Sequence, residues 1–444
     1  MAPGSEDLQQ EQPDSSSETF ERWLPLCRLA AFILVAFVML GAILTATRGA
    51  KGDIDVFIHA ARLVLEGKNI YDIPNQLGIY YLYPPLFAII NIPLTLIPID
   101  LAIVIWCVVT VVLLGWSIAV FYRAMTGVSF FAIPSRTRWT IGVFSVLLVE
   151  RFIETHLVLS QANALILAAS VAGLYLWSRE KNAPSGLALG ISLIIKPLTY
   201  PFGILFLARR DFRVLISMIV GALGGVLLPA LVFGFERNLQ YHMEWFEKVI
   251  LKHQPGYAGW VDTFNLSFQA QLFRFFTDIP SFYHGTSQYA FTIWRAPSGI
   301  LTVANWILLL TVPLLIILFA IRFRNSAPLV SKWGSVAFVF SLIPLSSTVA
   351  QEHHFVLLLP ACVYVVYLWA ERGLDERWFR GLVIGFFVLT ELTTRKIWGV
   401  FLSEVFIALG CMTFGTLLLS LAIVRGGLCI EKKDQRARLS EGDH

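Results

Sequence analysis

The sequence predicts an all-α protein, a polytopic bundle of transmembrane helices with about 12 membrane crossings. Of its 444 residues, 57% are apolar and only 14% are charged, whereas about a quarter of a soluble chain is charged. Apolar runs of 18 or more residues recur along the chain, and each is long enough to cross a hydrocarbon core of ~30 Å as a helix. The alternating segments of about 10 residues that form a membrane β-barrel are not seen in the sequence.

The chain begins with a polar, acidic stretch, 1–23, which we expect to be a disordered cytoplasmic tail. The apolar run 29–46 is long for the core of a signal peptide and lacks a clear cleavage site, so it predicts an uncleaved first span. Arg22 and Arg28 precede this run, and the positive-inside rule therefore places the N-terminus in the cytoplasm. The stretch 84–97 is short and interrupted by prolines, which favours a re-entrant or interfacial helix on the outer side.

Basic residues at the ends of the later apolar runs indicate the direction in which each remaining span crosses the membrane. The predicted spans are 100–122, 139–158, 160–178, 213–235, 298–321, 333–350, 354–371, 380–394 and 399–424. Residues 186–208 have basic residues on both flanks, so two half-length helices bent at Lys196-Pro197 are expected there, because proline ends a helix. The sequence thus predicts a membrane domain over 24–425, with outer loops at 47–99 and 236–297. A cytoplasmic basic tail over 426–444 follows it, so both termini are expected in the cytoplasm.

Polar residues gather at the predicted outer ends of the spans. Burying such residues in lipid costs free energy, so they normally face a cavity, a partner or the interface. They are Asp53, Asp55, Glu150, Arg151, Glu154, His156, Gln161, Asn163, Lys196, Gln351, Glu352, His353, His354, Arg395 and Lys396. A proton or ion pathway would place such groups through the full thickness of the membrane. The observed distribution predicts a polar cavity at the outer leaflet instead.

The chemistry that fits such a cavity is a reaction at the polar headgroup of a lipid. A carboxylate acts there as general base on an acceptor hydroxyl, and cationic or histidine side chains stabilise a departing lipid phosphate. Because the phosphate leaves as a stable anion, a second carboxyl acting as general acid is not required.

Each of these groups also has a structural interpretation, which the sequence leaves open. Asp53 or Asp55 is able to cap an interfacial helix, and Arg151 to form an ion pair with Glu150 or Glu154. The pair His353-His354 fits packing at the interface, since adjacent helical residues diverge by about 100°. Arg395 and Lys396 fit contact with lipid phosphates alone.

The stretches GDIDVFIHAARLVLEGKNIYD and YYLYPPLFAIINIPLTLIP resemble the first outer loop of glycosyltransferase family 87, polytopic enzymes of the C-type that use polyprenyl-phosphate sugars. The positions that carry the resemblance are Asp53, Phe57, Ala60-Ala61, Gly67, Tyr71 and Tyr83-Pro84-Pro85. Further matches, in the family's order, are Gln161-Ala-Asn163, Gly190 with Lys196-Pro197, Asn265-Leu-Ser267 with Gln269, and His353-His354. Together they cover roughly residues 50–360.

The resemblance implies an inverting transferase of the C-type fold, located in the plasma membrane with its site on the non-cytoplasmic side. Its partners would be a polyprenyl-phosphate sugar, with mannose or another hexose expected first and a pentose left open, a lipid or glycan acceptor, and membrane lipids. The expected catalytic base is Asp53, with Asp55 as the alternative. The expected donor-phosphate ligands are Lys196, His353, His354, Arg151 and Arg395, and the expected sugar or acceptor ligands are Gln161, Asn163, Asn265, Gln269 and Tyr83.

No cofactor, no metal-ligating residue set and no nucleic-acid partner is expected, and a requirement for a divalent metal is left open. The five cysteines show no metal-ligand spacing, and the net charge of +4 is accounted for by basic residues beside the spans. Ile70 and Ile58-His59 depart from the family pattern and leave the acceptor open. The alternative function is a lipid or glycolipid transporter, which would need gating half-helices in both halves of the chain.

Overall fold

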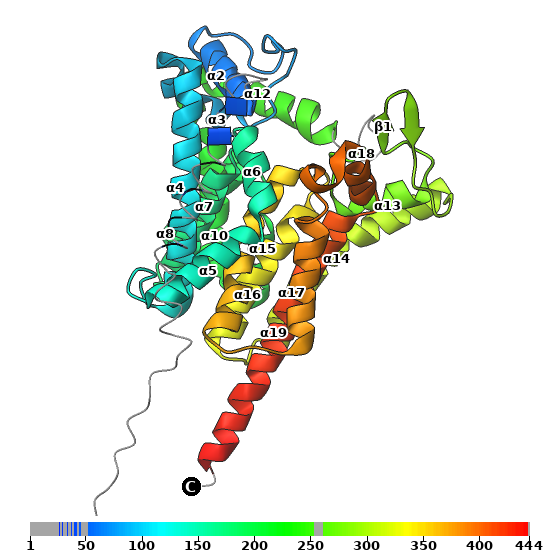
Figure 1. Ribbon diagram of the computed structural model, residues 1–444. Helices are drawn as coiled ribbons and strands as arrows, with labels where there is room; N and C mark the ends of the chain where they lie inside the picture. The colour runs from blue at the N-terminus through cyan, green and yellow to red at the C-terminus, as the bar shows by residue number, and fades with distance from the viewer. Residues whose placement is uncertain are drawn as a thin grey trace, which may run out of the picture.

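The computed structural model describes residues 52–252 and 261–442, together with isolated positions between 26 and 45. Within these ranges the chain is a helical bundle, and its one sheet is a hairpin of β1 Phe282–His284 and β2 Ser287–Tyr289 (Figure 1). The prediction of an all-α fold is confirmed. The predicted tail 1–23 lies outside the described residues, and so does most of the predicted first span 29–46.

Six helical segments in the described ranges are long and apolar enough to cross a membrane. They are α4 Ile99–Thr126, α10 Phe212–Leu227 with α11 Ala230–Phe233, α14 Ser298–Arg322, η3 Leu329–Gly334 with α15 Ser335–Ser346, η4 Glu352–Leu358 with α16 Leu359–Ala370, and α19 Cys411–Gly442. Helices α15 and α16 form the centre of the bundle, where nearly every side chain is buried. The total of about 12 crossings stays a prediction.

The other helices are shorter. They are α2 Gly52–Leu65, α3 Pro85–Ile90, η1 Ile92–Leu96, α5 Ser135–Leu147, α6 Glu150–Val158, α7 Asn163–Ser178, α8 Asn182–Ile195, α9 Pro201–Arg209, α12 Phe235–Trp245, η2 Phe246–Leu251, α13 Phe268–Phe276, α17 Arg377–Thr390 and α18 Arg395–Ala408. The predicted pair of half-length helices over 186–208 is confirmed, since α8 ends just before Lys196 and α9 begins at Pro201.

Two predicted single spans are wrong as continuous helices. The span 139–158 is divided between α5 and α6, because the backbone N–H of Arg151 donates to Glu391 Oε2 at 2.9 Å and so begins a new helix with a side-chain partner. The span 399–424 is divided between α18 and α19 at Gly410, whose φ of +83° ends the first helix. Hydropathy alone does not detect either break.

Glycines bring α8 and α10 into close contact. Gly186 and Gly190 lie one turn apart on α8, and Gly221 and Gly225 are spaced in the same way on α10. A Cβ atom on Gly186 or Gly190 would lie 2.4 Å from a backbone oxygen of α10, so any larger residue would separate the helices. Small residues four apart are a common device for packing membrane helices, and here they fix the position of α8 up to Lys196.

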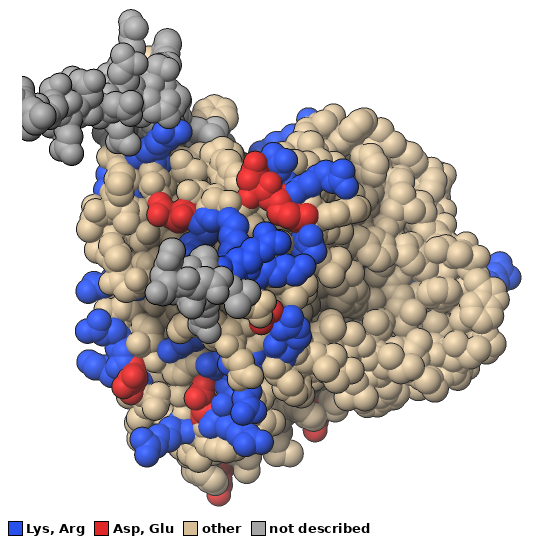
Figure 2. All heavy atoms as spheres, turned by 90° about the horizontal axis from the view of Figure 1, so that it is seen from below, with Lys and Arg blue, Asp and Glu red and all other residues tan. Residues whose placement is uncertain are grey.

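The bundle has two distinct ends (Figure 1). We call the end that holds α2, α12 and α18 the α2 end. The opposite end holds the turns that precede α5, α8, α10 and α17, together with the C-terminal part of α19. Seen from below, this opposite face carries many lysines and arginines and fewer acidic residues (Figure 2), and we call it the basic end.

Candidate functional site at the α2 end

Asp53 is held at the start of α2 by its neighbour Gly52. The backbone N–H of Asp53 donates to the carbonyl oxygen of Leu159, in the turn between α6 and α7, at 2.9 Å. Gly52 has a φ of +61°, and a Cβ atom there would lie 2.8 Å from the same carbonyl oxygen. Only glycine adopts this backbone without strain or collision, so it lets α2 begin against the α6–α7 turn.

The Asp53 carboxylate belongs to a chain of hydrogen bonds with fixed directions. Gln161 Nε2 donates to Asp53 Oδ2 at 2.5 Å, and the hydroxyl of Tyr83 donates to Gln161 Oε1 at 3.0 Å. The indole N–H of Trp106 on α4 donates to the backbone oxygen of Gln161 at 3.1 Å. Because its oxygen accepts from Tyr83, the Gln161 amide presents its NH₂ group to Asp53. The fold therefore brings together three predicted site residues, Asp53, Gln161 and Tyr83.

Lys196 supplies the positive charge that faces Asp53. It lies at the end of α8, and its Nζ is 5.5 Å from the centre of the Tyr83 ring and 2.5 Å from Nε2 of His354. Burial raises the pKa of Asp53, while the charge of Lys196 and the hydrogen bond from Gln161 oppose that rise. Burial lowers the pKa of Lys196 to about 8, against the opposing effect of the Asp53 charge. Each group thus stabilises the charged form of the other.

Two histidines of η4 and one of α6 surround Lys196. Nδ1 of His354 accepts the backbone N–H of Gln351 at 3.1 Å, and the rings of His353 and His354 are nearly perpendicular, 4.5 Å apart. His156 is fully buried, and its Nε2 accepts the backbone N–H of Ala164 at 3.1 Å. Asn163 Nδ2 donates to the backbone oxygen of His353 at 2.8 Å. These bonds join the α6–α7 turn to η4.

Several buried polar atoms in this region have no partner among the described residues, and three of them belong to residues discussed above. These three are His156 Nδ1, His353 Nε2 and Asn163 Oδ1. Buried polar groups in proteins normally find partners, so unpaired donors and acceptors beside Lys196 indicate a place for polar groups of a bound molecule or for water. Asn163 and His353 were both predicted for this site, and His156 was predicted only as one of the polar residues at the outer ends.

The two predicted arginine ligands lie in ion pairs of their own. The buried guanidinium of Arg151 pairs with Glu352 and donates to the backbone oxygen of Thr390 at 3.0 Å. Its ion-pair partner is therefore neither of the glutamates that the sequence suggested. Arg395 is half-exposed and pairs with Glu404. Among the described contacts, neither guanidinium reaches Asp53 or Lys196, and the roles predicted for both as donor-phosphate ligands stay predictions.

Asn265 lies in the loop before α13, and Gln269 lies in the first turn of that helix. Asn265 Nδ2 donates to the backbone oxygen of Thr348 at 3.1 Å, and its Oδ1 accepts the N–H of Ala350 at 3.0 Å. This residue therefore ties the loop before α13 to the segment that leads into η4. Gln269 is buried, and neither atom of its amide has a partner among the described residues. It remains available to a ligand, whereas the Asn265 amide is used for structure.

Asp55 points away from this cluster. Its Oδ2 accepts from Asn75 Nδ2 at 2.8 Å, in the loop that follows α2. Side chains two residues apart on a helix point about 200° apart. Because α2 is helical from its start, the two aspartate side chains have different surroundings. The structure places Asp53, and not Asp55, beside Lys196 and Gln161.

Fold and site together define a multi-pass helical membrane protein with a carboxylate, an amide and a lysine gathered where several helices end. The chain belongs to glycosyltransferase family 87, whose model matches residues 81–304. It is 25% identical over 217 residues to an α-(1→3)-arabinofuranosyltransferase of Corynebacterium glutamicum, which covers 48% of this chain and 50% of that protein. It is also 27% identical over 192 residues to a polyprenol-phosphate-mannose-dependent α-(1→2)-phosphatidylinositol mannoside mannosyltransferase of Mycobacterium tuberculosis, covering 40% of this chain and 44% of that protein. The matched region spans about half the length of these curated relatives.

Sequence reasoning missed two contributors to the site. Trp106 lies in an apolar span and gives no local signal, although its indole N–H holds the backbone of Gln161. Glu352 was named only as a polar residue at an outer end, but it neutralises Arg151 across 201 positions of the chain. A buried arginine needs a carboxylate nearby. This requirement predicts that Arg151 has an acidic partner, but it does not identify the partner as Glu352.

Proposed function

We propose that this protein is a membrane glycosyltransferase that moves a sugar from a polyprenyl-phosphate donor to a hydroxyl group of a lipid or glycan acceptor at the α2 end. The observation that carries the proposal is the juxtaposition of Asp53 and Lys196, a carboxylate and an ammonium group oriented by Gln161 and Tyr83. Membership of family 87 supports the class of reaction.

In the proposed reaction, Asp53 removes the proton of the acceptor hydroxyl as its oxygen attacks the anomeric carbon of the donor. The bond between that carbon and the phosphate oxygen breaks on the opposite face, so the configuration inverts. The leaving polyprenyl phosphate carries the electron pair of the broken bond, and Lys196 with His354 stabilises its negative charge. A raised pKa makes Asp53 a stronger base once it is ionised.

The donor sugar is proposed to be mannose or another hexose first, with a pentose as the other candidate. The names of the two relatives support this pair, since one is a mannosyltransferase dependent on polyprenol-phosphate-mannose and the other an arabinofuranosyltransferase. Gln269, with an unpartnered buried amide, and Asn163 are the proposed ligands for sugar or acceptor hydroxyls.

We further propose that the basic end faces the cytoplasm of a cell whose plasma membrane holds the protein, and that the α2 end faces outward. The turns at the basic end are rich in arginine and lysine (Figure 2). They include Arg136, Arg138, Arg179, Lys181, Arg209, Arg210, Arg213, Arg322, Arg324, Arg372 and Arg377. Excess positive charge on short loops marks the cytoplasmic side of membrane proteins.

The direct test is sugar transfer from radiolabelled polyprenyl-phosphate mannose, glucose or arabinose by the purified full-length chain in lipid nanodiscs. Asp53→Asn removes the base at nearly constant volume and is expected to lower turnover by about 10²–10⁴. Asp55→Asn is the matched control and is expected to stay near the wild-type rate, because that side chain faces Asn75.

Near-native turnover of Asp53→Asn, with Asp55→Asn inactive, would assign the base to the other aspartate. If both variants keep turnover, this loop supplies no base. If the wild-type chain instead moves intact donor lipid across the bilayer without transfer, the protein is a transporter.

A further inference from the structure

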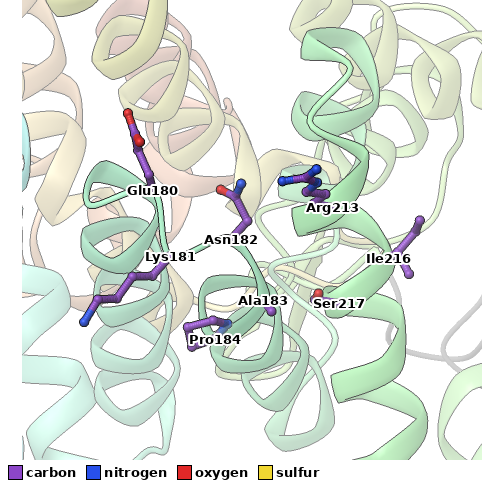
Figure 3. Close-up of a pocket in the computed structure, with 8 residues that line it drawn as sticks. All are labelled: Glu180, Lys181, Asn182, Ala183, Pro184, Arg213, Ile216 and Ser217. Atoms are coloured by element: carbon purple, nitrogen blue, oxygen red, sulfur yellow. The ribbon is translucent and has the colours of Figure 1, made fainter.

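A cavity of about 570 Å³ opens at the basic end, far from the Asp53 cluster, between the α7–α8 turn and the first turns of α10 (Figure 3). Its lining includes Lys181, Asn182 and Pro184 on one side and Arg213, Ile216 and Ser217 on the other. The cavity is open on one side, so a molecule is able to enter it without displacing a helix.

Three polar side chains of the cavity converge and have no partner. In Figure 3 the guanidinium of Arg213 and the amide of Asn182 point toward one another, and Ser217 lies one turn along α10 from Arg213. None of these three side chains has a hydrogen-bond or ion-pair partner among the residues that the structure describes. Glu180 and Lys181 also line the cavity, and their side chains extend away from Arg213 in the same view. The cavity therefore presents an unneutralised guanidinium with neutral donors beside it, which suits a phosphate group.

An exposed apolar surface continues from this cavity along α8 and α10. On α8, Leu187 and Ile191 are 41% and 47% exposed, and on α10, Ile216 and Leu223 are 60% and 56% exposed. Because glycines occupy the contact between the two helices, larger apolar side chains of both helices are left on the outer surface of the pair. Because α10 with α11 is a candidate span, this surface lies against acyl chains when the protein is in a membrane.

We propose that the Arg213 cavity binds the phosphate headgroup of an anionic phospholipid, whose acyl chains lie along the α8–α10 surface. A free phosphate ion would be held by the polar residues alone, whereas the continuous apolar surface below them fits a molecule with hydrocarbon chains. The lipid comes from the leaflet at the basic end, where clustered basic side chains also attract anionic headgroups. This site is separate from the proposed transferase site and does not depend on the identity of the sugar.

The experiment is a titration of the full-length chain in detergent with phosphatidylglycerol, followed by native mass spectrometry. Arg213→Gln removes the guanidinium from an exposed position and is expected to weaken binding of the first lipid about tenfold. Arg210→Gln is the matched control, because it removes one charge three residues away on the same face without lining the cavity. That variant is expected to bind like the wild type.

A second arm separates the lipid from its headgroup. Glycerol phosphate carries the same phosphate chemistry without acyl chains and is expected to compete weakly or not at all, and phosphatidylcholine is expected to bind at least tenfold more weakly than phosphatidylglycerol. Equal losses for Arg213→Gln and Arg210→Gln would show diffuse surface attraction and overturn the proposal. Effective competition by glycerol phosphate would also overturn it, in favour of a site for a soluble phosphate.

Discussion

The two ends of the bundle hold their charged residues in different ways. At the α2 end, Asp53 and Lys196 lie in the interior of a site, where each stabilises the charged form of the other and Gln161 donates a hydrogen bond to Asp53. At the basic end, ion pairs such as Arg425–Glu376 at 3.0 Å and Arg322–Glu431 at 2.8 Å lie at the surface. Exposed pairs contribute little to stability, whereas buried charges are costly unless they are paired. The charges at the basic end fit the orientation and lipid contact proposed above, whereas the buried Asp53–Lys196 pair at the α2 end fits the proposed transfer reaction.

Each end of the bundle has a lysine that lies over an aromatic ring. Lys196 is 5.5 Å from the centre of the Tyr83 ring, and Lys332 is 4.1 Å from the centre of the Trp177 ring. Cation–π contacts of this kind are common structural features. Only Lys196 also faces a carboxylate within the candidate site, so substitutions at the two positions should have unequal effects on transfer.

Among the variants that compare the two ends, the largest effect is expected for Lys196→Met, which keeps the length of the side chain and removes its charge. Without the cation beside the leaving phosphate, kcat/KM for the donor is expected to fall by about 10²–10³. Lys332→Met is the control and should stay within about twofold of the wild type. Equal losses in the two variants, measured by transfer assays at saturating acceptor, would contradict a role for Lys196 at the phosphate.

Glycines with a positive φ offer the next comparison. Gly52 has a φ of +61° and meets the Leu159 backbone, whereas Gly373 has a φ of +56° and open space around it. Gly373→Ala is expected to cost about 1 kcal/mol of unfolding free energy from backbone strain alone.

Gly52→Ala adds a collision to the same strain, so it is expected to cost about 1–3 kcal/mol more and to reduce transfer at least tenfold by moving Asp53. Thermal unfolding and transfer assays of both variants provide the measurement. Identical behaviour of the two variants would show that the contact of Gly52 with Leu159 does not position the site.

The pH dependence of transfer is expected to be bell-shaped. Transfer requires protonated Lys196, whose pKa is about 8, so the rate should fall about tenfold per unit as the pH rises above that value. It also requires ionised Asp53, and the raised pKa of that carboxyl moves the acidic limb upward from its ordinary position. Lys196→Arg should displace the alkaline limb to higher pH, because a guanidinium stays charged, while Lys332→Arg should leave the profile in place. An alkaline limb that is the same in Lys196→Arg would assign it to another group.

The smallest effect is expected for the removal of one tyrosine hydroxyl. Tyr83→Phe deletes the donor to Gln161 and keeps the ring under Lys196, so transfer should fall by about threefold to tenfold, the equivalent of one neutral hydrogen bond. Tyr364→Phe is the control, since that buried hydroxyl has no partner among the described residues and its loss should be neutral or stabilising. A larger effect at Tyr364 than at Tyr83 would contradict the described hydrogen-bond network.

The sequence was sufficient for the features that depend on local composition. Long apolar runs predicted the helical membrane fold, and Lys196-Pro197 between basic flanks predicted the division into α8 and α9, because proline ends a helix. Polar residues at the ends of apolar runs predicted that Asp53, Gln161 and Lys196 lie close together, because such groups avoid lipid.

Features that depend on packing between distant segments could not be predicted in this way. The different surroundings of Asp53 and Asp55 depend on the start of α2, which the contact of Gly52 with Leu159 fixes. The partner of Arg151 required knowledge that η4 packs on α6, since Glu352 is far away in the chain. Arg151 and Arg395 were predicted as phosphate ligands because of their charge. In the structure each guanidinium forms an ion pair with a glutamate.

The most direct test of the central claim is a structure of the full-length Asp53→Asn variant with an intact polyprenyl-phosphate sugar bound in a lipid nanodisc. We predict phosphate density within hydrogen-bonding distance of Lys196 and His354, with the anomeric carbon of the sugar between the phosphate and residue 53. Donor phosphate bound at the basic end, or a sugar directed away from residue 53, would contradict it.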